Sequence, residues 1–210
     1  MLLTIAGSSC SGKTTAVRAC AEIDGLVVHD FDEIGVPAGA DIKWRQRSTE
    51  EWIQRVLSYQ AVGLDVILTG QSPLGEVLAS PSATELNGIA ACLLDVDDGV
   101  RWQRIEGRDP GKWDVDAKRS FVDWARWHRG HATDPHHHPE VVTANGYEGM
   151  KWARWSGWPS TDHRWVVRVI DTTGRTAEQS AADIGRWVAE ARCDLAAGRL
   201  ALAGTWASGS

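Results

Sequence analysis

The sequence predicts an α/β fold: a doubly wound parallel sheet of five strands with a lid or insertion before the last strand. Five short apolar runs alternate along the chain with segments of helical pattern. The runs are mostly apolar on both faces, which is typical of parallel strands that are covered on both sides. A length of 210 residues fits a single domain over 1–210 and makes a second full domain unexpected.

The predicted strands follow one another at regular intervals. The first, 2–7, has the sequence LLTIAG and leads into a loop of small polar residues. The others are 25–30, 65–70, 89–96 and 165–171, with the sequences GLVVHD, DVILTG, IAACLLDV and WVVRVID. Strands of this kind, separated by helices, build a parallel sheet by repeated crossovers.

Four helices are predicted between and after these strands, at 13–23, 49–62, about 100–108 and from 177 towards 198. Ser48 and Glu51 have the spacing of a capping box and open the second helix, and Thr176 and Gln179 do the same for the last one. Pro110 ends the third helix, because proline cannot continue one.

The segment 111–164 interrupts this alternation. It is rich in Trp, His, Arg and Gly, and seven of the twelve tryptophans fall between Trp102 and Trp158. A loop of this length inside a compact domain is usually functional or mobile, so we interpret it as a lid or a substrate-binding insertion. Trp124, Trp127, Trp152, Trp155 and Trp158 are expected to form a small satellite core, with one or two rings reaching a pocket.

Five histidines lie between His128 and His138, a composition that can bind a transition metal. His136, His137 and His138 are consecutive beside prolines, so their side chains cannot all reach one ion without an unusual backbone. A polar loop is therefore the expectation for this cluster.

Composition excludes several classes of protein. The formal net charge of −6 provides no basic footprint for nucleic acid. The four cysteines contain no CxxC pair, which predicts reduced thiols and a cytoplasmic protein. Neither a secretory signal nor an apolar run long enough to cross a membrane is present, so no membrane partner is expected.

The stretch AGSSCSGKTT, residues 6–15, follows the first strand and opens the first helix. Its spacing satisfies G-x-x-x-x-G-K-[ST], the P-loop pattern, in the context that the pattern requires. Backbone N–H groups of such a loop surround a phosphate, the lysine reaches the β- and γ-phosphates, and the threonine hydroxyl ligates Mg²⁺. The sequence therefore predicts ATP and Mg²⁺ as cofactors, with the nucleotide bound by Gly7, Ser9, Cys10, Ser11, Gly12, Lys13, Thr14 and Thr15.

Other P-loop classes fit less well. A GTPase needs a base-reading N-K-x-D, which the chain lacks, and the D-x-x-G spacing at 171–174 follows the last strand instead of the third. A large ATPase usually has a strand that ends in adjacent acidic residues, and DVILTGQSP has none at its end. A small phosphotransferase remains.

Asp30 and Asp32 lie two positions apart at the carboxyl end of the second strand. In extended geometry their carboxylates project from the same face, at the strand end where open α/β sheets bind ligands. A kinase needs one carboxylate near Mg²⁺ and another near the acceptor hydroxyl, which loses its proton. In the next-to-last predicted helix Arg101, Arg104 and Arg108 share one face and could neutralise charge on a transferring phosphoryl group.

The chain resembles the small P-loop kinases of the nucleoside, shikimate, gluconate and chloramphenicol phosphotransferase type. The likeness rests on GSSCSGKTT, HDFDEI, WRQRSTEEW, LTGQSP, RWQRIEGRDP and IDTTGRT, which occur in that order and cover most of the chain outside 111–164. The resemblance implies a phosphotransferase and identifies no acceptor.

The resemblance also implies residue roles. Asp30 would act in the water shell of Mg²⁺ beside Thr14, and Asp32 would contact the acceptor. The other acceptor-binding candidates are Arg45, Arg47, Gly70 and Gln71. Arginines that open the lid, Arg104 among them, would contact the nucleotide, and the loop that carries Thr173, Gly174 and Arg175 would cradle adenine.

The sequence thus predicts an ATP- and Mg²⁺-dependent kinase that phosphorylates a hydroxyl of a nucleoside-like or antibiotic-like small molecule. Lys13, Asp32 and Arg108 are the catalytic candidates. The alternative is a nucleotide-binding regulator or weak ATPase whose insertion binds a protein partner. Release of ADP that depends on an acceptor separates the two.

Overall fold

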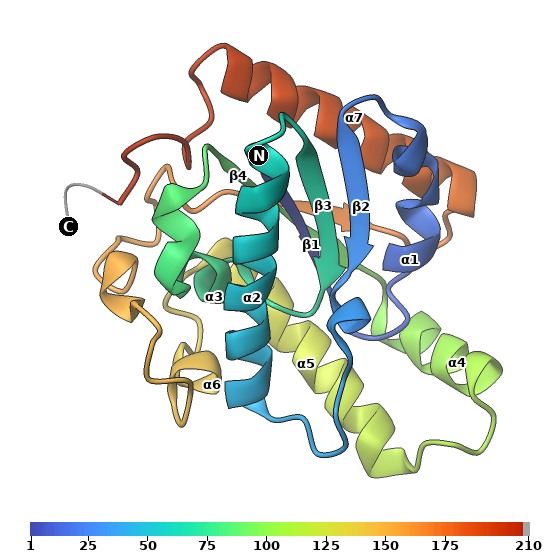
Figure 1. Ribbon diagram of the computed structural model, residues 1–210. Helices are drawn as coiled ribbons and strands as arrows, with labels where there is room; N and C mark the ends of the chain where they lie inside the picture. Colours follow the sequence, from blue (N-terminus) through green and yellow to red (C-terminus); the bar gives the residue numbers. More distant parts are fainter. Residues whose placement is uncertain (208–210) are drawn as a thin grey trace.

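The computed structural model describes residues 1–207 and contains one parallel sheet with the strand order β2-β3-β1-β4-β5. The strands are β1 (Leu2–Ala6), β2 (Leu26–Asp30), β3 (Asp65–Gly70), β4 (Ile89–Asp95) and β5 (Val167–Asp171). All five predicted strands are confirmed, each within two residues of its expected ends. Figure 1 shows the sheet between two groups of helices.

The register brings the carboxyl ends of the strands to one edge of the sheet. Ala6 pairs with both Gly70 and Leu93, and Asp30 pairs with Thr69. Every residue of β1 is buried, because this strand is the centre of the sheet and is apolar on both faces. The loop that follows β1 therefore leaves the sheet in the middle of the edge at which open α/β sheets bind ligands.

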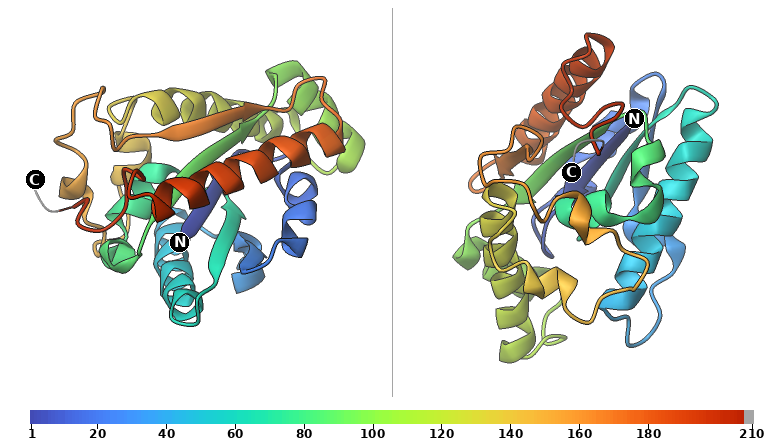
Figure 2. Two further views of the ribbon diagram at one scale, coloured as in Figure 1. Left: turned by 90° about the horizontal axis from the view of Figure 1, so that it is seen from above. Right: turned by 90° about the vertical axis from the view of Figure 1, so that its left-hand side faces the viewer.

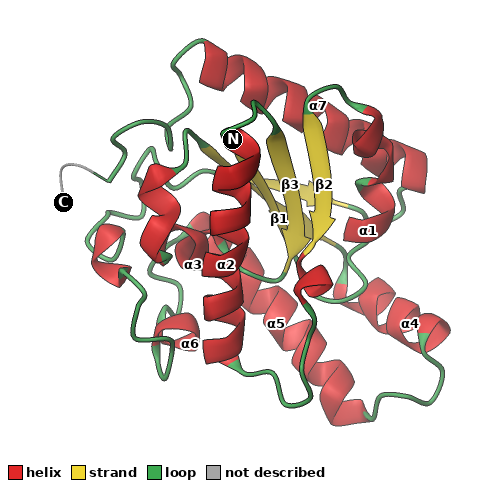
Figure 3. Ribbon diagram, in the orientation of Figure 1, coloured by secondary structure: helices red, strands yellow, loops and turns green. Residues whose placement is uncertain are grey.

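Helices cover both faces, as a doubly wound fold requires (Figures 2 and 3). One apolar core joins the sheet to α1 (Lys13–Ala16), the 3₁₀ helix Arg18–Glu22 and α7 (Ala177–Ala196). The other joins it to α2 (Ile42–Gln60) and α3 (Leu74–Ala79). The remaining helices are α4 (Asp98–Arg108), α5 (Val115–Thr133), α6 (Glu140–Thr143) and the 3₁₀ helices Phe31–Ile34, Pro81–Glu85 and Trp152–Arg154.

The structure corrects two of the predicted helices and confirms the predicted start of the last one. The expected helix 13–23 is split, because after one α-helical turn the chain continues as a 3₁₀ helix. Helix α2 begins at Ile42 and not at Thr49, since the Asp41 side chain accepts a hydrogen bond from Trp44 N at 2.7 Å and caps it. Ser48 is buried inside that helix. The capping box of Thr176 and Gln179 at the start of α7 is present.

Much of the segment 111–164 is part of the fold and not a loop. Helix α5 contacts β4 and β5 and is capped by the Asp114 side chain. The expectation of a polar loop is wrong for His128 and His131, which lie on the buried face of α5 with exposed fractions of 2% and 1%. Among residues 1–207 no helix is long and apolar enough to cross a membrane.

The tryptophans of this segment extend the main core. Trp155 and Trp158 belong to the same buried cluster as Trp52 of α2 and Trp165, so the predicted satellite core is wrong. The rings of Trp124 and Trp127 stack with centroids 4.8 Å apart, and Trp127 in turn stacks on His131. An aromatic layer of this kind supplies apolar area that the sheet alone would leave exposed.

Candidate active site

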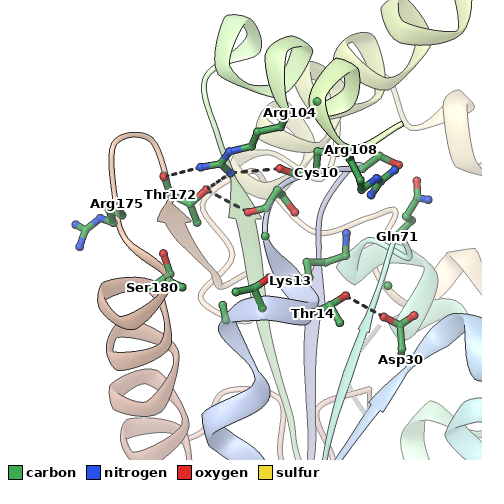
Figure 4. A pocket seen from close by; sticks show the side chains of 18 of the residues that line it. Cys10, Lys13, Thr14, Asp30, Gln71, Arg104, Arg108, Thr172, Arg175 and Ser180 are labelled. Carbon is green, nitrogen blue, oxygen red and sulfur yellow. Dashed lines mark hydrogen bonds between the residues drawn. The ribbon is translucent and has the colours of Figure 1, made fainter. Parts of the chain in front are cut away.

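A cleft of about 720 Å³ lies at the carboxyl ends of the strands. It is bounded by the P-loop, the ends of β2 and β3, helix α4 and the start of α7, as Figure 4 shows. The predicted site residues that line it are Ser9, Cys10, Ser11, Gly12, Lys13, Thr14, Thr15, Asp30, Asp32, Gly70, Gln71, Arg104, Arg108 and Arg175. Motifs far apart in the sequence thus meet in one place.

Other lining residues were not expected: Ala16, Gly107, Thr172, Thr176, Ala177 and Ser180. Thr172 and Thr176 belong to the turn into α7, where the sequence indicated Thr173 and Gly174 instead, and Ala177 and Ser180 belong to the first turn of α7. Thr173 and Gly174 do not line the cleft; Thr173 bonds to the Asp171 carboxylate at 2.6 Å. Thr172 is buried below the turn and was missed because a single threonine after a strand has no distinguishing spacing. Among residues 1–207 no tryptophan lines the cleft, so the expectation that one or two rings reach the pocket is wrong for this cleft.

The conformation of the P-loop depends on close packing at Gly7. A Cβ added there would lie 2.4 Å from the carbonyl oxygen of Leu94 and 2.9 Å from Ser11 Oγ. Gly12, with φ of 96°, adopts a backbone conformation that other residues rarely adopt. Within residues 1–207 the amides of Cys10, Gly12 and Lys13 donate to no protein acceptor. They form a set of free donors of the kind that binds a phosphate.

Lys13 is held close to the loop. Its Nζ donates to the carbonyl of Gly7 at 2.7 Å and of Ser8 at 3.3 Å. Burial of the ammonium group lowers the pKa of Lys13 from 10.5 to about 8, although nearby Asp30 and Asp32 partly oppose the shift. The two carbonyl oxygens carry only partial negative charge. An anion in the cleft would give the ammonium group of Lys13 a fully charged partner.

Asp30 is the N-cap of the 3₁₀ helix Phe31–Ile34. Its Oδ1 accepts a hydrogen bond from Asp32 N at 3.0 Å, and its amide donates to Glu33 Oε1 at 2.9 Å. The two carboxylates reach the cleft through this capping box. The expectation that Asp32 continues an extended strand is therefore wrong, because β2 ends at Asp30.

The other oxygen of Asp30 faces the P-loop. Asp30 Oδ2 lies 3.4 Å from Thr14 Oγ1 (Figure 4). It also lies 3.2 Å from Thr69 Oγ1. A hydroxyl and a carboxylate suit Mg²⁺, which takes few protein ligands and keeps water and phosphate oxygens for the rest. These two residues fit the expected metal.

Asp32 is exposed and lines the same cleft as Asp30. Partial burial and the neighbouring charge of Asp30 raise the pKa of Asp32, against the effect of Lys13. A carboxylate with a raised pKa accepts a proton more readily than a free one.

The three arginines of α4 do not act together. Arg101 is fully buried, pairs with Asp95 and donates to the carbonyl of Ser9 at 2.6 Å. The Arg104 guanidinium bonds to Cys10 O and to Thr172, each at 3.3 Å (Figure 4). Arg108 alone is exposed, with a bond to Asp109 at 2.9 Å. The expectation that all three converge on a phosphoryl group is wrong for Arg101.

Neither predicted acceptor-gripping arginine lines the cleft. Arg45 makes two hydrogen bonds to Glu76, at 2.6 and 3.0 Å, and its guanidinium lies 4.9 Å from the ring centre of Trp124. Glu76 is completely buried, so it requires a partner and Arg45 supplies it. Arg47 is exposed on α2 and does not line the cleft. The structure gives Arg45 a structural partner in place of a free guanidinium.

The histidines of 128–138 are divided between two environments. Burial lowers the pKa of His128 and of His131, the latter to about 4. His136 Nε2 lies 2.7 Å from the carbonyl of Trp158. In the described part of the chain no group of three or more His, Cys, Asp or Glu side chains is arranged to hold a metal.

No protein-family model matches the sequence, and no curated protein matches it either. Solved structures do match. A sugar kinase from Janibacter sp. HTCC2649 is 17% identical, with 89% of this chain and 93% of that chain covered and a TM-score of 0.53. A thymidylate kinase from Candida albicans is 12% identical, with 90% and 91% covered and a TM-score of 0.50. At these identities the likeness concerns the fold, and the chain has the α/β fold of the small P-loop kinases.

Proposed function

We propose that the protein is a kinase that transfers the γ-phosphoryl group of ATP to a hydroxyl of a small molecule. The observation that carries the proposal is that the P-loop and two carboxylates, Asp30 and Asp32, line one cleft. A nucleotide-binding loop alone would support only binding. A carboxylate that faces the threonine of the loop and a second beside it provide the further groups that phosphoryl transfer requires.

The P-loop forms the nucleotide half of the site. The free amides of Cys10 and Gly12 would bind phosphate oxygens, and Lys13 would exchange the carbonyl of Gly7 for a phosphate oxygen. Arg104 and Arg175 border the same half. Thr14 and Asp30 would hold Mg²⁺, which would supply neutralisation of phosphate charge, and ATP would supply the phosphoryl group.

The carboxyl end of β2, with Asp30 and Asp32, would form the acceptor half of the site together with Gly70 and Gln71. Asp32 would orient the acceptor hydroxyl and take its proton as the new P–O bond forms. Arg108 at the mouth of the cleft would exchange Asp109 for the charge on the transferring group. We propose a nucleoside-like or antibiotic-like molecule as the acceptor, a choice that the panel described next tests.

The test compares two substitutions after a panel of nucleosides, sugars and antibiotics has identified an acceptor by ADP release. Asp32→Asn keeps size and hydrogen bonding and removes the base, so turnover is expected to fall by about 10² to 10⁴. The affinity for Mg·ATP, measured by calorimetry, should change little. Asp30→Asn should instead raise the Mg²⁺ concentration that half-maximal activity needs.

Asp116→Asn is the matched control, because Asp116 is an exposed aspartate of α5 that pairs with Arg119 away from the cleft. It should leave turnover unchanged. If Asp30→Asn and Asp32→Asn have equally small effects on turnover, the kinase assignment is wrong. A nucleotide-binding regulator or weak ATPase is then the better description.

A further inference from the structure

Three consecutive carbonyl groups of the P-loop are hydrogen-bonded from behind. The carbonyl of Ser9 accepts from Arg101 Nη1 at 2.6 Å, and that of Cys10 accepts from Arg104 Nη1 at 3.3 Å. The carbonyl of Ser11 lies 3.1 Å from the hydroxyl of Thr172. The donors come from α4 and from the turn after β5, so two elements outside the loop hold its backbone.

These bonds determine where the loop amides point. A trans peptide is planar, and its C=O and N–H groups point in opposite directions. The carbonyls of Ser9 and Ser11 share peptide planes with the amides of Cys10 and Gly12. Fixing the two carbonyls against the protein therefore turns those two amides away from it, and they are amides that donate to no protein acceptor within residues 1–207.

The strongest of the three anchors is built into the core. Arg101 has no exposed surface, and its carboxylate partner Asp95 is 7% exposed at the end of β4. Arg129 also lies 3.5 Å from Asp95. Moving this guanidinium into solvent would leave the buried Asp95 carboxylate without the partner nearest to it. Arg101 therefore stays in place, where it donates to the carbonyl of Ser9.

Thr172 links the loop carbonyl of Ser11 to Asp95 at the end of β4. Its amide donates to the carbonyl of Asp95 at 2.8 Å, and its hydroxyl lies 3.0 Å from that carbonyl and 3.1 Å from that of Ser11. The hydroxyl has one proton, which these two carbonyls share, and its oxygen accepts a hydrogen bond from Arg104 Nη1 at 3.3 Å. The residue is 3% exposed.

We propose that Arg101 and Thr172 are positioning residues that hold the P-loop in its anion-binding conformation before nucleotide arrives. They act through the loop carbonyls, which orient the amides of Cys10 and Gly12 towards the phosphates. Such orientation lowers the cost of ordering the loop on binding. The inference rests on the nucleotide-binding part of the proposed function and not on phosphoryl transfer.

The first test uses Thr172→Val, which keeps the shape and removes the hydroxyl, and Thr172→Ser, which restores it. Affinities for Mg·ATP and for inorganic tripolyphosphate with Mg²⁺ are measured by calorimetry. Loss of one buried hydrogen bond corresponds to about 2- to 10-fold, and both ligands should lose affinity by that factor in Thr172→Val. Thr172→Ser should bind within about 2-fold of the unaltered protein.

Thr49→Val is the matched control. Thr49 is equally buried, and its hydroxyl bonds to Arg45 O and Ser72 Oγ, outside the P-loop. It should lower the melting temperature without changing the tripolyphosphate affinity. If Thr172→Val binds both ligands as the unaltered protein does, or if Thr172→Ser fails to restore binding, the proposal is overturned.

The second test is Arg101→Lys. An ammonium group keeps the charge beside Asp95 and lacks the planar fork that also reaches Ser9. Affinity for tripolyphosphate should fall by at least 10-fold, since a bond from a charged donor is lost. Unchanged affinity in a folded Arg101→Lys protein would overturn the role of Arg101, and the Thr172 pair decides the proposal if that variant does not fold. Because the readout is binding, a failure of the proposed phosphoryl transfer would appear in turnover and not in these affinities.

Discussion

Binding of Mg·ATP should be accompanied by uptake of protons at Lys13. In the nucleotide-free protein burial lowers the pKa of Lys13 to about 8. Phosphate oxygens in the cleft would place negative charge beside the ammonium group and raise its pKa again. The protein should therefore take up protons from the solution when nucleotide binds.

The magnitude follows from the shifted pKa. At pH 8 about half of the Lys13 side chains are neutral, so binding takes up roughly 0.5 proton per site. At pH 7 only about one in ten is neutral, and the uptake falls to roughly 0.1. The shift also affects stability: between pH 8 and 10.5 the unfolded chain holds more protons at Lys13 than the folded one, so this residue makes the free energy of unfolding rise with pH. Below about pH 8 its contribution is constant.

The assay is calorimetric titration in buffers of different ionisation enthalpy, since the slope of the observed heat against that enthalpy counts the protons. Lys13→Arg is the matched control, because a guanidinium stays charged at both pH values. The reasoning is refuted if the slope at pH 8 is no larger than at pH 7, or if Lys13→Arg gives the same difference between the two.

Three further outcomes are expected. Gly7→Ala should lower the free energy of unfolding by about 1 to 3 kcal/mol in denaturant titration, because its Cβ would lie 2.4 Å from the Leu94 carbonyl oxygen; an unchanged midpoint would contradict this packing. Arg45→Met should destabilise the fold by about 3 kcal/mol, since it leaves the buried Glu76 carboxylate without its charged partner, and Arg47→Met, at an exposed position, should not. EDTA in modest excess over any bound zinc should leave the melting temperature of the nucleotide-free protein unchanged, and a large drop would show that the histidines of 128–138 hold a structural metal.

The parts of the fold that local sequence determines were predictable. A buried strand that runs into a loop of small residues and then a lysine places the P-loop without knowledge of any distant residue, and the structure has it between β1 and α1. The capping box of Thr176 and Gln179 is equally local. The strand ends that carry Asp30 and Gly70 were found because apolar runs stop where the chain leaves the sheet.

The predictions that were wrong concern residues whose environment is set by parts of the chain far away in sequence. Arg45 was interpreted as a free ligand-binding side chain, and only the fold brings it to Glu76. Ser48 and Glu51 have the spacing of a capping box, but Asp41 starts the helix earlier and the local pattern is overridden. The burial of His128 and His131 has a sequence pattern, because with Val122 and Ala125 they recur every three residues. Such spacing indicates one helical face, and it is the buried face of α5.

The bonds of Arg101 and Thr172 to the loop carbonyls could not be predicted, because a sequence does not show which side chain reaches a given backbone carbonyl. Arginines three and seven residues apart predict a shared helix face and say nothing of which one points to solvent. The structure separates them by burial, with Arg101 inside and Arg108 outside. Sequence patterns thus identified which elements meet at the cleft, and packing decided which side chains are free to act there.

The fate of the γ-phosphoryl group tests the central claim most directly. The protein is incubated with Mg·ATP labelled in that group and with the acceptor from the panel, and the label is followed into products. The account predicts that it appears as a phosphate ester of the acceptor in amounts equal to the ADP formed, and that Lys13→Ala abolishes this transfer while retaining the melting temperature. Label recovered only as inorganic phosphate, at a rate that the acceptor does not change, would contradict the claim.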